Sequence, residues 1–116
     1  MKLAELSPEF IRYERRGDGH VYMPHVESIV DAQGINFLCP HCYGIMRGMR
    51  GTHDVICWSR SAGTPDLAHP GPGRWKIAGT GFHDLTLNAE LPGGARSVDL
   101  TSTCGAHFFV TNGEIH

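Results

Sequence analysis

Large apolar residues are scarce in this 116-residue sequence, where Leu, Ile, Val and Phe together fill only 26 positions. No apolar run comes near the roughly 18 residues that a membrane-spanning helix requires. No stretch shows sustained helical periodicity either. The formal net charge of −2 provides no broad positive field for nucleic acid. These absences argue against a membrane protein, a helical bundle and a nucleic-acid-binding protein.

An apolar leader segment is also missing, because the stretch from Met1 to Glu9 carries acidic residues and Pro8. Without a secretory signal, the four cysteines are expected to stay reduced, so we expect a cytoplasmic protein with free thiols rather than disulfides. Cysteines in that setting indicate metal binding or redox chemistry. The sequence has no thioredoxin-like βαβ pattern, which disfavours the redox role.

Glycine and proline are abundant by contrast, with 15 and 7 residues. Much of the chain is therefore expected to form turns and loops, whose backbone is costly to order. The length fits a single domain with a small core. A structural zinc ion contributes on the order of 10 kcal/mol of coupled binding and folding free energy, enough to stabilise such a domain.

Two short motifs supply the ligands for such an ion. Cys39-Pro40-His41-Cys42 and Cys104-Gly105-Ala106-His107 each place two potential donors on one tight turn. Three thiolates and one imidazole form the ligand set of a closed, tetrahedral, structural zinc site. The spacing therefore predicts zinc bound by Cys39, Cys42, Cys104 and His107.

A second ligand set stays open, because His53 and Cys57 follow Cys42 at a spacing close to that of a zinc finger. That set needs a helix, since residues four apart converge only on one helical face. The segment around His53 favours a strand, in which such residues lie about 13 Å apart. We therefore prefer the first set, and interpret Cys57 as a buried apolar residue.

The pattern of the remaining sequence predicts a mostly β fold, a small single-domain antiparallel sheet or sandwich with long loops, tied together by the two zinc knuckles. Thr111-Asn112-Gly113 lies between apolar runs and predicts a terminal hairpin. Residues 1–20 are expected to be an N-terminal extension or short helix, and residues 21–116 the zinc-bound β domain. Alternation or β-branched composition predicts strands over residues 34–38, 54–58, 74–77, 84–88 and 97–101.

Residues 34–116 resemble an uncharacterised zinc-knuckle family of phage, prophage and bacterial proteins (domain of unknown function 6527). The resemblance rests on Phe37-Leu38 before the first knuckle, on Leu85-Thr86-Leu87, and on the final Cys-x-x-His-Phe-Phe hairpin. It implies a bacterial or phage-infected host and, from the gene neighbours of some relatives, a protein partner. Such proteins are sometimes labelled ammonia monooxygenase, a name that these residues do not support. Asn88-Ala89 stands where the family has a Pro-Ser pair.

Two function classes follow from the zinc site. The first, which we favour, is a small zinc-stabilised module that binds another protein and is not an enzyme at the metal. Exposed groups near the first knuckle that could contact a partner are Tyr43, Arg47 and Arg50. The alternative is a small zinc-dependent hydrolase or deaminase. His25-Val26-Glu27 resembles the deaminase His-x-Glu pair, but Pro40 follows the first cysteine of the knuckle rather than preceding it.

Overall fold

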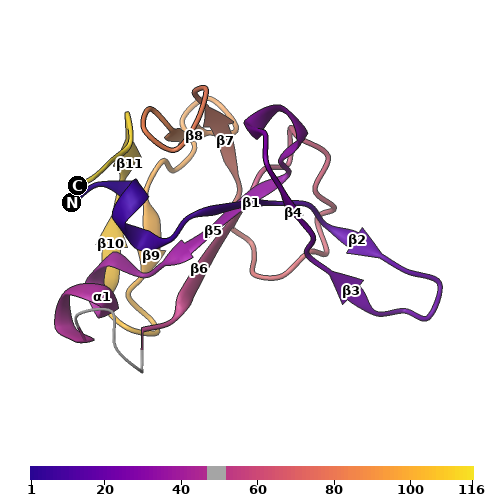
Figure 1. The fold of residues 1–116 in the computed structure, drawn as a ribbon, viewed down its shortest axis with the longest axis horizontal. Coiled ribbons are helices and arrows are strands. Elements are labelled where there is room, and N and C mark those ends of the chain that lie inside the picture. The colour runs from indigo at the N-terminus through magenta and orange to yellow at the C-terminus, as the bar shows by residue number, and fades with distance from the viewer. Residues whose placement is uncertain (47–51) are drawn as a thin grey trace.

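The computed structural model describes residues 1–46 and 52–116, which form one mostly β unit of short antiparallel strands (Figure 1). The predicted fold class is confirmed. Within those residues the elements are η1 (Leu3–Leu6), β1 (Glu9–Ile11), β2 (Glu14–Arg15), β3 (Val21–Tyr22), β4 (His25–Val26), η2 (Ile29–Asp31), β5 (Gly34–Leu38), α1 (Pro40–Met46), β6 (Asp54–Trp58), β7 (Trp75–Ala78), β8 (Thr86–Ala89), β9 (Val98–Leu100), β10 (Ala106–Phe108), β11 (Val110–Thr111) and β12 (Glu114–Ile115).

The largest sheet has four strands in the order β4-β1-β5-β6, all neighbours antiparallel. Strands β5 and β6 form its longest pair, with Gly34 opposite Trp58 and Leu38 opposite Asp54. Both begin and end at the predicted residues, because their β-branched and aromatic side chains suit a half-buried pleated surface. This pair delivers Cys39 and His53 to the same end of the sheet.

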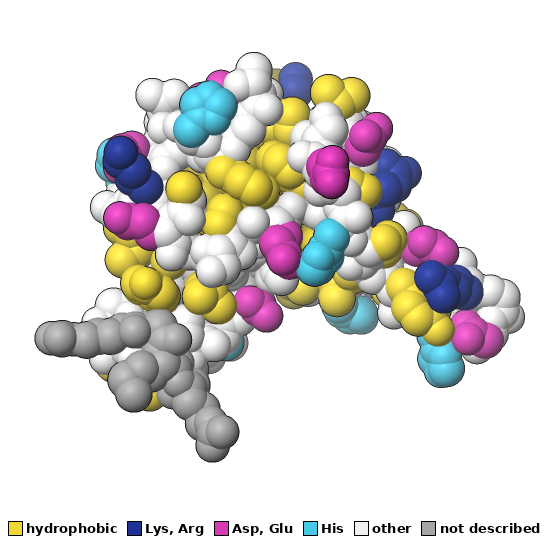
Figure 2. All heavy atoms as spheres, viewed as in Figure 1, with side chains coloured by type: hydrophobic (Ala, Val, Ile, Leu, Met, Phe, Trp, Pro, Cys, Tyr) yellow, Lys and Arg dark blue, Asp and Glu magenta, His cyan; other side chains and the backbone are white. Residues whose placement is uncertain are grey.

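Smaller two-stranded sheets complete the fold: β2-β3, β7-β8, β9-β10 and β11-β12. The β2-β3 hairpin projects from the body, and charged side chains cover it at the lower right of Figure 2. The β11-β12 hairpin is the predicted terminal hairpin. Its turn residues Asn112 and Gly113 both have positive φ, as a two-residue hairpin turn of this type requires.

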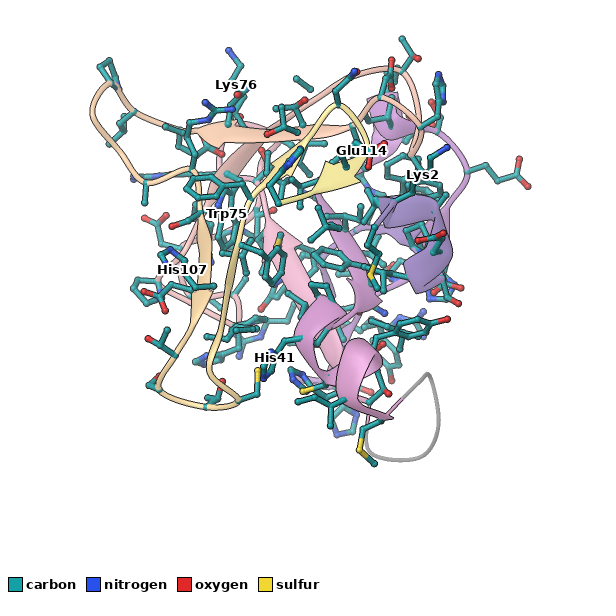
Figure 3. The ribbon with its side chains drawn as sticks, turned by 90° about the vertical axis from the view of Figure 1, so that its left-hand side faces the viewer. Lys2, His41, Trp75, Lys76, His107 and Glu114 are labelled. Atoms are coloured by element: carbon teal, nitrogen blue, oxygen red, sulfur yellow. The ribbon has the colours of Figure 1, made fainter. Side chains whose placement is uncertain are left out.

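Residues 2–11 belong to the folded body, whereas residues 14–20 lie in the projecting β2-β3 hairpin. Leu3 and Leu6 are fully buried in the main core, and β1 lies between β4 and β5 in the largest sheet. The backbone of Lys2 forms an isolated antiparallel β-bridge with that of Glu114, so the start of the chain lies beside the terminal hairpin, and Figure 3 labels both residues. The sequence did not indicate this role, because strand β1 is too short to show alternation.

The main core is made mostly of side chains from η1, β1, both strands of the β5-β6 pair, and strands β8 to β11. Phe37 packs edge-on against Phe108 across it, with ring centroids 6.0 Å apart. A smaller cluster contains Ile11, Trp58 and Ala68. No helix among the described residues is long and apolar enough to cross a membrane.

Candidate metal centre

The first knuckle turns from β5 into the short helix α1. Cys39 is the last residue before the helix, and Pro40 takes the first helical position, where a missing backbone N–H costs nothing. The carbonyl of Cys39 accepts a hydrogen bond from the Tyr43 N–H at 2.8 Å. Cys42 therefore lies on the first helical turn, close to Cys39, which is buried.

The β5-β6 register brings His53 to the same place. The N–H of Cys39 donates to the His53 carbonyl at 2.8 Å, so these two residues extend the strand ladder by one step. His53 Nδ1 lies 3.1 Å from the Asp54 carbonyl. In the tautomer with its proton on Nδ1, the ring donates this hydrogen bond and leaves Nε2 free for a metal ion.

The second knuckle supplies Cys104 from the turn between β9 and β10. The Leu100 carbonyl accepts hydrogen bonds from the N–H groups of Thr103, Cys104 and Gly105, at 3.0 to 3.1 Å. Gly105 has a φ of +87°. This tight turn aims the Cys104 sulfur at the first knuckle, and the Ala106 N–H donates to the sulfur.

Four donor atoms meet here, all within 4.8 Å of one another: those of Cys39, Cys42, His53 and Cys104. The sulfurs of Cys39 and Cys104 are 3.8 Å apart, far beyond the roughly 2.05 Å of a disulfide. A tetrahedral zinc ion with bonds of about 2.3 Å places two sulfurs about 3.8 Å apart. All four cysteines are free, so the arrangement fits a metal ion of this kind.

The thiols shift one another's pKa values in opposite directions. Burial, with hydrogen bonds to Cys104 and Cys39, raises the pKa of Cys42 to about 11. Burial acts in the same direction on Cys104, but hydrogen bonds from Ala106, His53 and the other two thiols outweigh it and lower that pKa to about 7. The hydrogen bond to Cys104 raises the pKa of His53. A cluster that stabilises thiolate next to imidazole is suited to a cation.

The predicted ligand set needs one correction, because His53 stands where the sequence analysis placed His107. His107 is exposed on β10, opposite Asp99 of β9. Figure 3 shows it on the outer side of this strand pair, apart from His41 and the start of α1. Ala106 and Phe108 point into the core, so strand alternation turns the side chain between them outward.

Cys57 behaves as the sequence analysis expected. It is fully buried on β6, and burial raises its pKa far above the usual value. His53 and Cys57 cannot both reach one ion, because residues four apart in an extended segment lie about 13 Å apart. This distance excludes the pair as joint ligands but not His53 by itself. The signal that could have identified His53 was the antiparallel pairing of segments 34–38 and 54–58.

Of the residues expected to contact a partner, Tyr43 is half-buried and packs against the main core. Arg47 and Arg50 lie outside the described residues. His25, on β4, pairs with Glu9 at 3.0 Å. The metal-binding group identified among residues 1–46 and 52–116 contains no carboxylate.

Comparison of the chain with models of known families gives no match, and comparisons with characterised proteins and with solved structures give no significant similarity.

Proposed function

We propose that this protein is a zinc-stabilised binding module, in which Cys39, Cys42, His53 and Cys104 hold a structural zinc ion. The observation that carries the proposal is the donor set: three sulfurs and one imidazole converge without a carboxylate. Zinc in a complete tetrahedron has no position left for an activated water. When bound, the ion would supply a cross-link between the β5-β6 end of the sheet, α1 and the β9-β10 turn.

We further propose a protein partner and a bacterial or phage origin, which rest on the sequence resemblance alone. We also propose a cytoplasmic location, because the cysteines are free thiols. The function is then binding, with the metal holding the binding surface in shape. This proposal assigns no reaction to the protein.

Cobalt(II) substitution tests whether the metal site is closed. The expected spectrum has the ligand-field bands of a tetrahedral cobalt–thiolate site, and these bands stay unchanged when azide or acetohydroxamate is added. A shift of the bands on addition of either compound would show an exchangeable coordination position. That result would overturn the proposal and favour the zinc hydrolase or deaminase.

A further inference from the structure

A groove runs from the metal centre along the outer edge of β6. Its volume is about 740 Å³, within the range of about 300–1,000 Å³ typical of ligand pockets. Its lining includes β6 from Asp54 to Ile56 and residues 97–100, which contain β9. Two candidate metal ligands, His53 and Cys104, also line it, as do Trp75 and the loop of residues 70–73.

The β6 wall presents unpaired backbone groups to this groove. The Cys39 N–H donates to the His53 carbonyl, and the Ser59 N–H donates to the Gln33 carbonyl. The backbone groups of residues 53, 55, 57 and 59 therefore point toward β5. In an antiparallel ladder the residues between them point their backbone groups the other way. The N–H of Asp54 and both backbone groups of Ile56 therefore face outward, and no partner for them occurs among the described residues.

The spacing of these groups matches an extended peptide. Asp54 and Ile56 are two residues apart, so their outward N–H groups repeat at about 6.8 Å along the strand. A peptide in β conformation offers carbonyls and N–H groups at the same repeat, which is the basis of recognition by strand addition. Trp75 and Leu100, which are only partly buried, supply apolar surface for the side chains of such a peptide.

The charge of the groove favours a basic peptide. Asp54 and Asp99 are exposed, and neither forms an ion pair within the part of the chain that the structure describes. Arg74 is the one Arg among the described residues of the lining. It already donates to carbonyls of its own loop, those of Pro65, Asp66, Ala68, Pro70 and Gly73. A zinc ion with three thiolates and a neutral imidazole adds a formal charge of −1 at the groove's end.

We infer that this groove binds an extended segment of a partner protein, carrying basic residues alternating with apolar ones, as an added strand on β6. The inference rests on the proposed function, because zinc would fix the end of β6 where Asp54 lies. The loop of residues 70–73 and β9 flank the edge, which protects it from unspecific pairing with other strands. A second copy of the chain would bring the same acidic groups, so charge favours a different protein.

Selection from a library of random ten-residue peptides on immobilised, zinc-loaded full-length protein tests this inference. We expect peptides with alternating basic and apolar residues to be enriched. The most enriched peptide, added to ¹⁵N-labelled protein, should shift the amide signals of Asp54 and Ile56 and the Trp75 indole signal. Selection of acidic peptides, no selection at all, or unchanged signals at these positions would overturn the inference.

Two matched pairs sharpen the test. Two variants of the selected peptide carry N-methyl groups on every second residue, one on the odd-numbered and the other on the even-numbered residues. Only one of these two sets of amides faces β6, so one variant should bind about tenfold or more weakly and the other should bind like the unmethylated peptide. Ala95→Trp fills the groove from an exposed loop and should weaken binding by a similar factor, whereas Ala4→Trp on η1 should not. Equal binding within either pair would contradict strand addition.

The peptide experiment and the cobalt experiment can fail independently of each other. A closed cobalt site without selective peptide binding would refute the groove and leave the structural zinc intact. An open cobalt site would refute the structural zinc whatever the peptides do.

Discussion

Single residues in this protein are placed by strand alternation and register. His53 directly precedes β6, whereas His107 lies in the middle of β10. The sequence alone ranks His107 higher because of its spacing from Cys104. In the structure, His107 alternates outward between two buried residues, while His53 continues the β5-β6 ladder opposite Cys39. The fourth donor is thus decided by which strands pair.

The first prediction compares these two histidines. His53→Ala should weaken zinc binding by about 100-fold or more, above the 10- to 100-fold typical of residues that only orient a ligand. His107→Ala is the matched control and should bind zinc as the unsubstituted protein does. Competition with a chromophoric chelator measures both affinities. The reverse ranking would restore the ligand set predicted from spacing.

The second prediction concerns Asp84, in the loop between β7 and β8. Its carboxylate accepts hydrogen bonds from the N–H and hydroxyl of Thr80 and from the N–H of Gly81, and these lower its pKa to about 2. Because the folded-state pKa lies below the ordinary value of 3.8, this stabilisation is complete above pH 3.8 and is lost as the pH falls toward 2.

Asp84→Asn should therefore lower the melting temperature by a few degrees, and by the same amount throughout the range from about pH 5.5 to 8. Melting curves followed by circular dichroism at several pH values check this. Thr101→Ala removes the hydroxyl that donates to the Asp99 carboxylate. Its change in melting temperature shows how much one such hydroxyl–carboxylate hydrogen bond contributes elsewhere in the chain. A difference for Asp84→Asn that fades between pH 8 and 5.5 would show that the carboxyl titrates higher than we state.

At the scale of elements, the strands are short and loops carry much of the specificity. The Arg74 guanidinium binds five carbonyls of the loop that ends at β7, and so gives that loop a defined shape.

The terminal hairpin is held to the rest of the fold through the backbone of Gly113. Its N–H donates to the Leu85 carbonyl and its own carbonyl accepts from the Leu3 N–H, both at 2.8 Å.

The third prediction tests this junction. Gly113 has a φ of +77°, and a Cβ added there would collide with the carbonyl group of His83. Gly113→Ala should destabilise the fold by more than about 2 kcal/mol, since both backbone strain and a clash with backbone occur. Urea unfolding of the zinc-loaded protein measures the change.

Gly93→Ala is the matched control, because Gly93 has a similar φ of +79° but open space around it. It should cost only about 1–2 kcal/mol, the price of left-handed backbone alone. Equal effects at the two glycines would mean that the contact with His83 is not rigid.

For the whole molecule, the proposed metal links elements that share the main core but, apart from β5 and β6, are not paired in one sheet. The four candidate ligands come from the end of β5, the start of α1, the residue before β6 and the β9-β10 turn. The helix α1 belongs to no sheet, and β9 and β10 form a two-stranded sheet separate from that of β5 and β6. Burial in a chain with few large apolar residues gives them limited additional stability.

The fourth prediction is that removal of zinc unfolds the domain or sharply lowers its melting temperature. The apparent binding energy of a structural zinc site, on the order of 10 kcal/mol, equals or exceeds the stability of an ordinary small domain. Melting with an excess of chelator measures the effect, and chelator already saturated with zinc is the control. Unchanged melting in the metal-free protein would show that the site does not stabilise the fold.

The sequence by itself determined the fold class, the two strands of the longest pair, the terminal hairpin and the three cysteines that converge. Each of these depends on short-range features: alternation, an Asn112-Gly113 turn, and donors two residues apart on one turn. Such features act within a few residues and can be identified without knowledge of distant neighbours.

The tertiary structure decided the role of residues 2–11, the fourth donor and the groove beside β6. Strand β1 is three residues long, so only its two neighbours in the sheet identify it. His53 is a candidate ligand because β5 and β6 pair in one register, and the groove exists because β6 has a free edge facing β9. Pairings between distant segments depend on how all strands pack together, and no local pattern in the sequence records them.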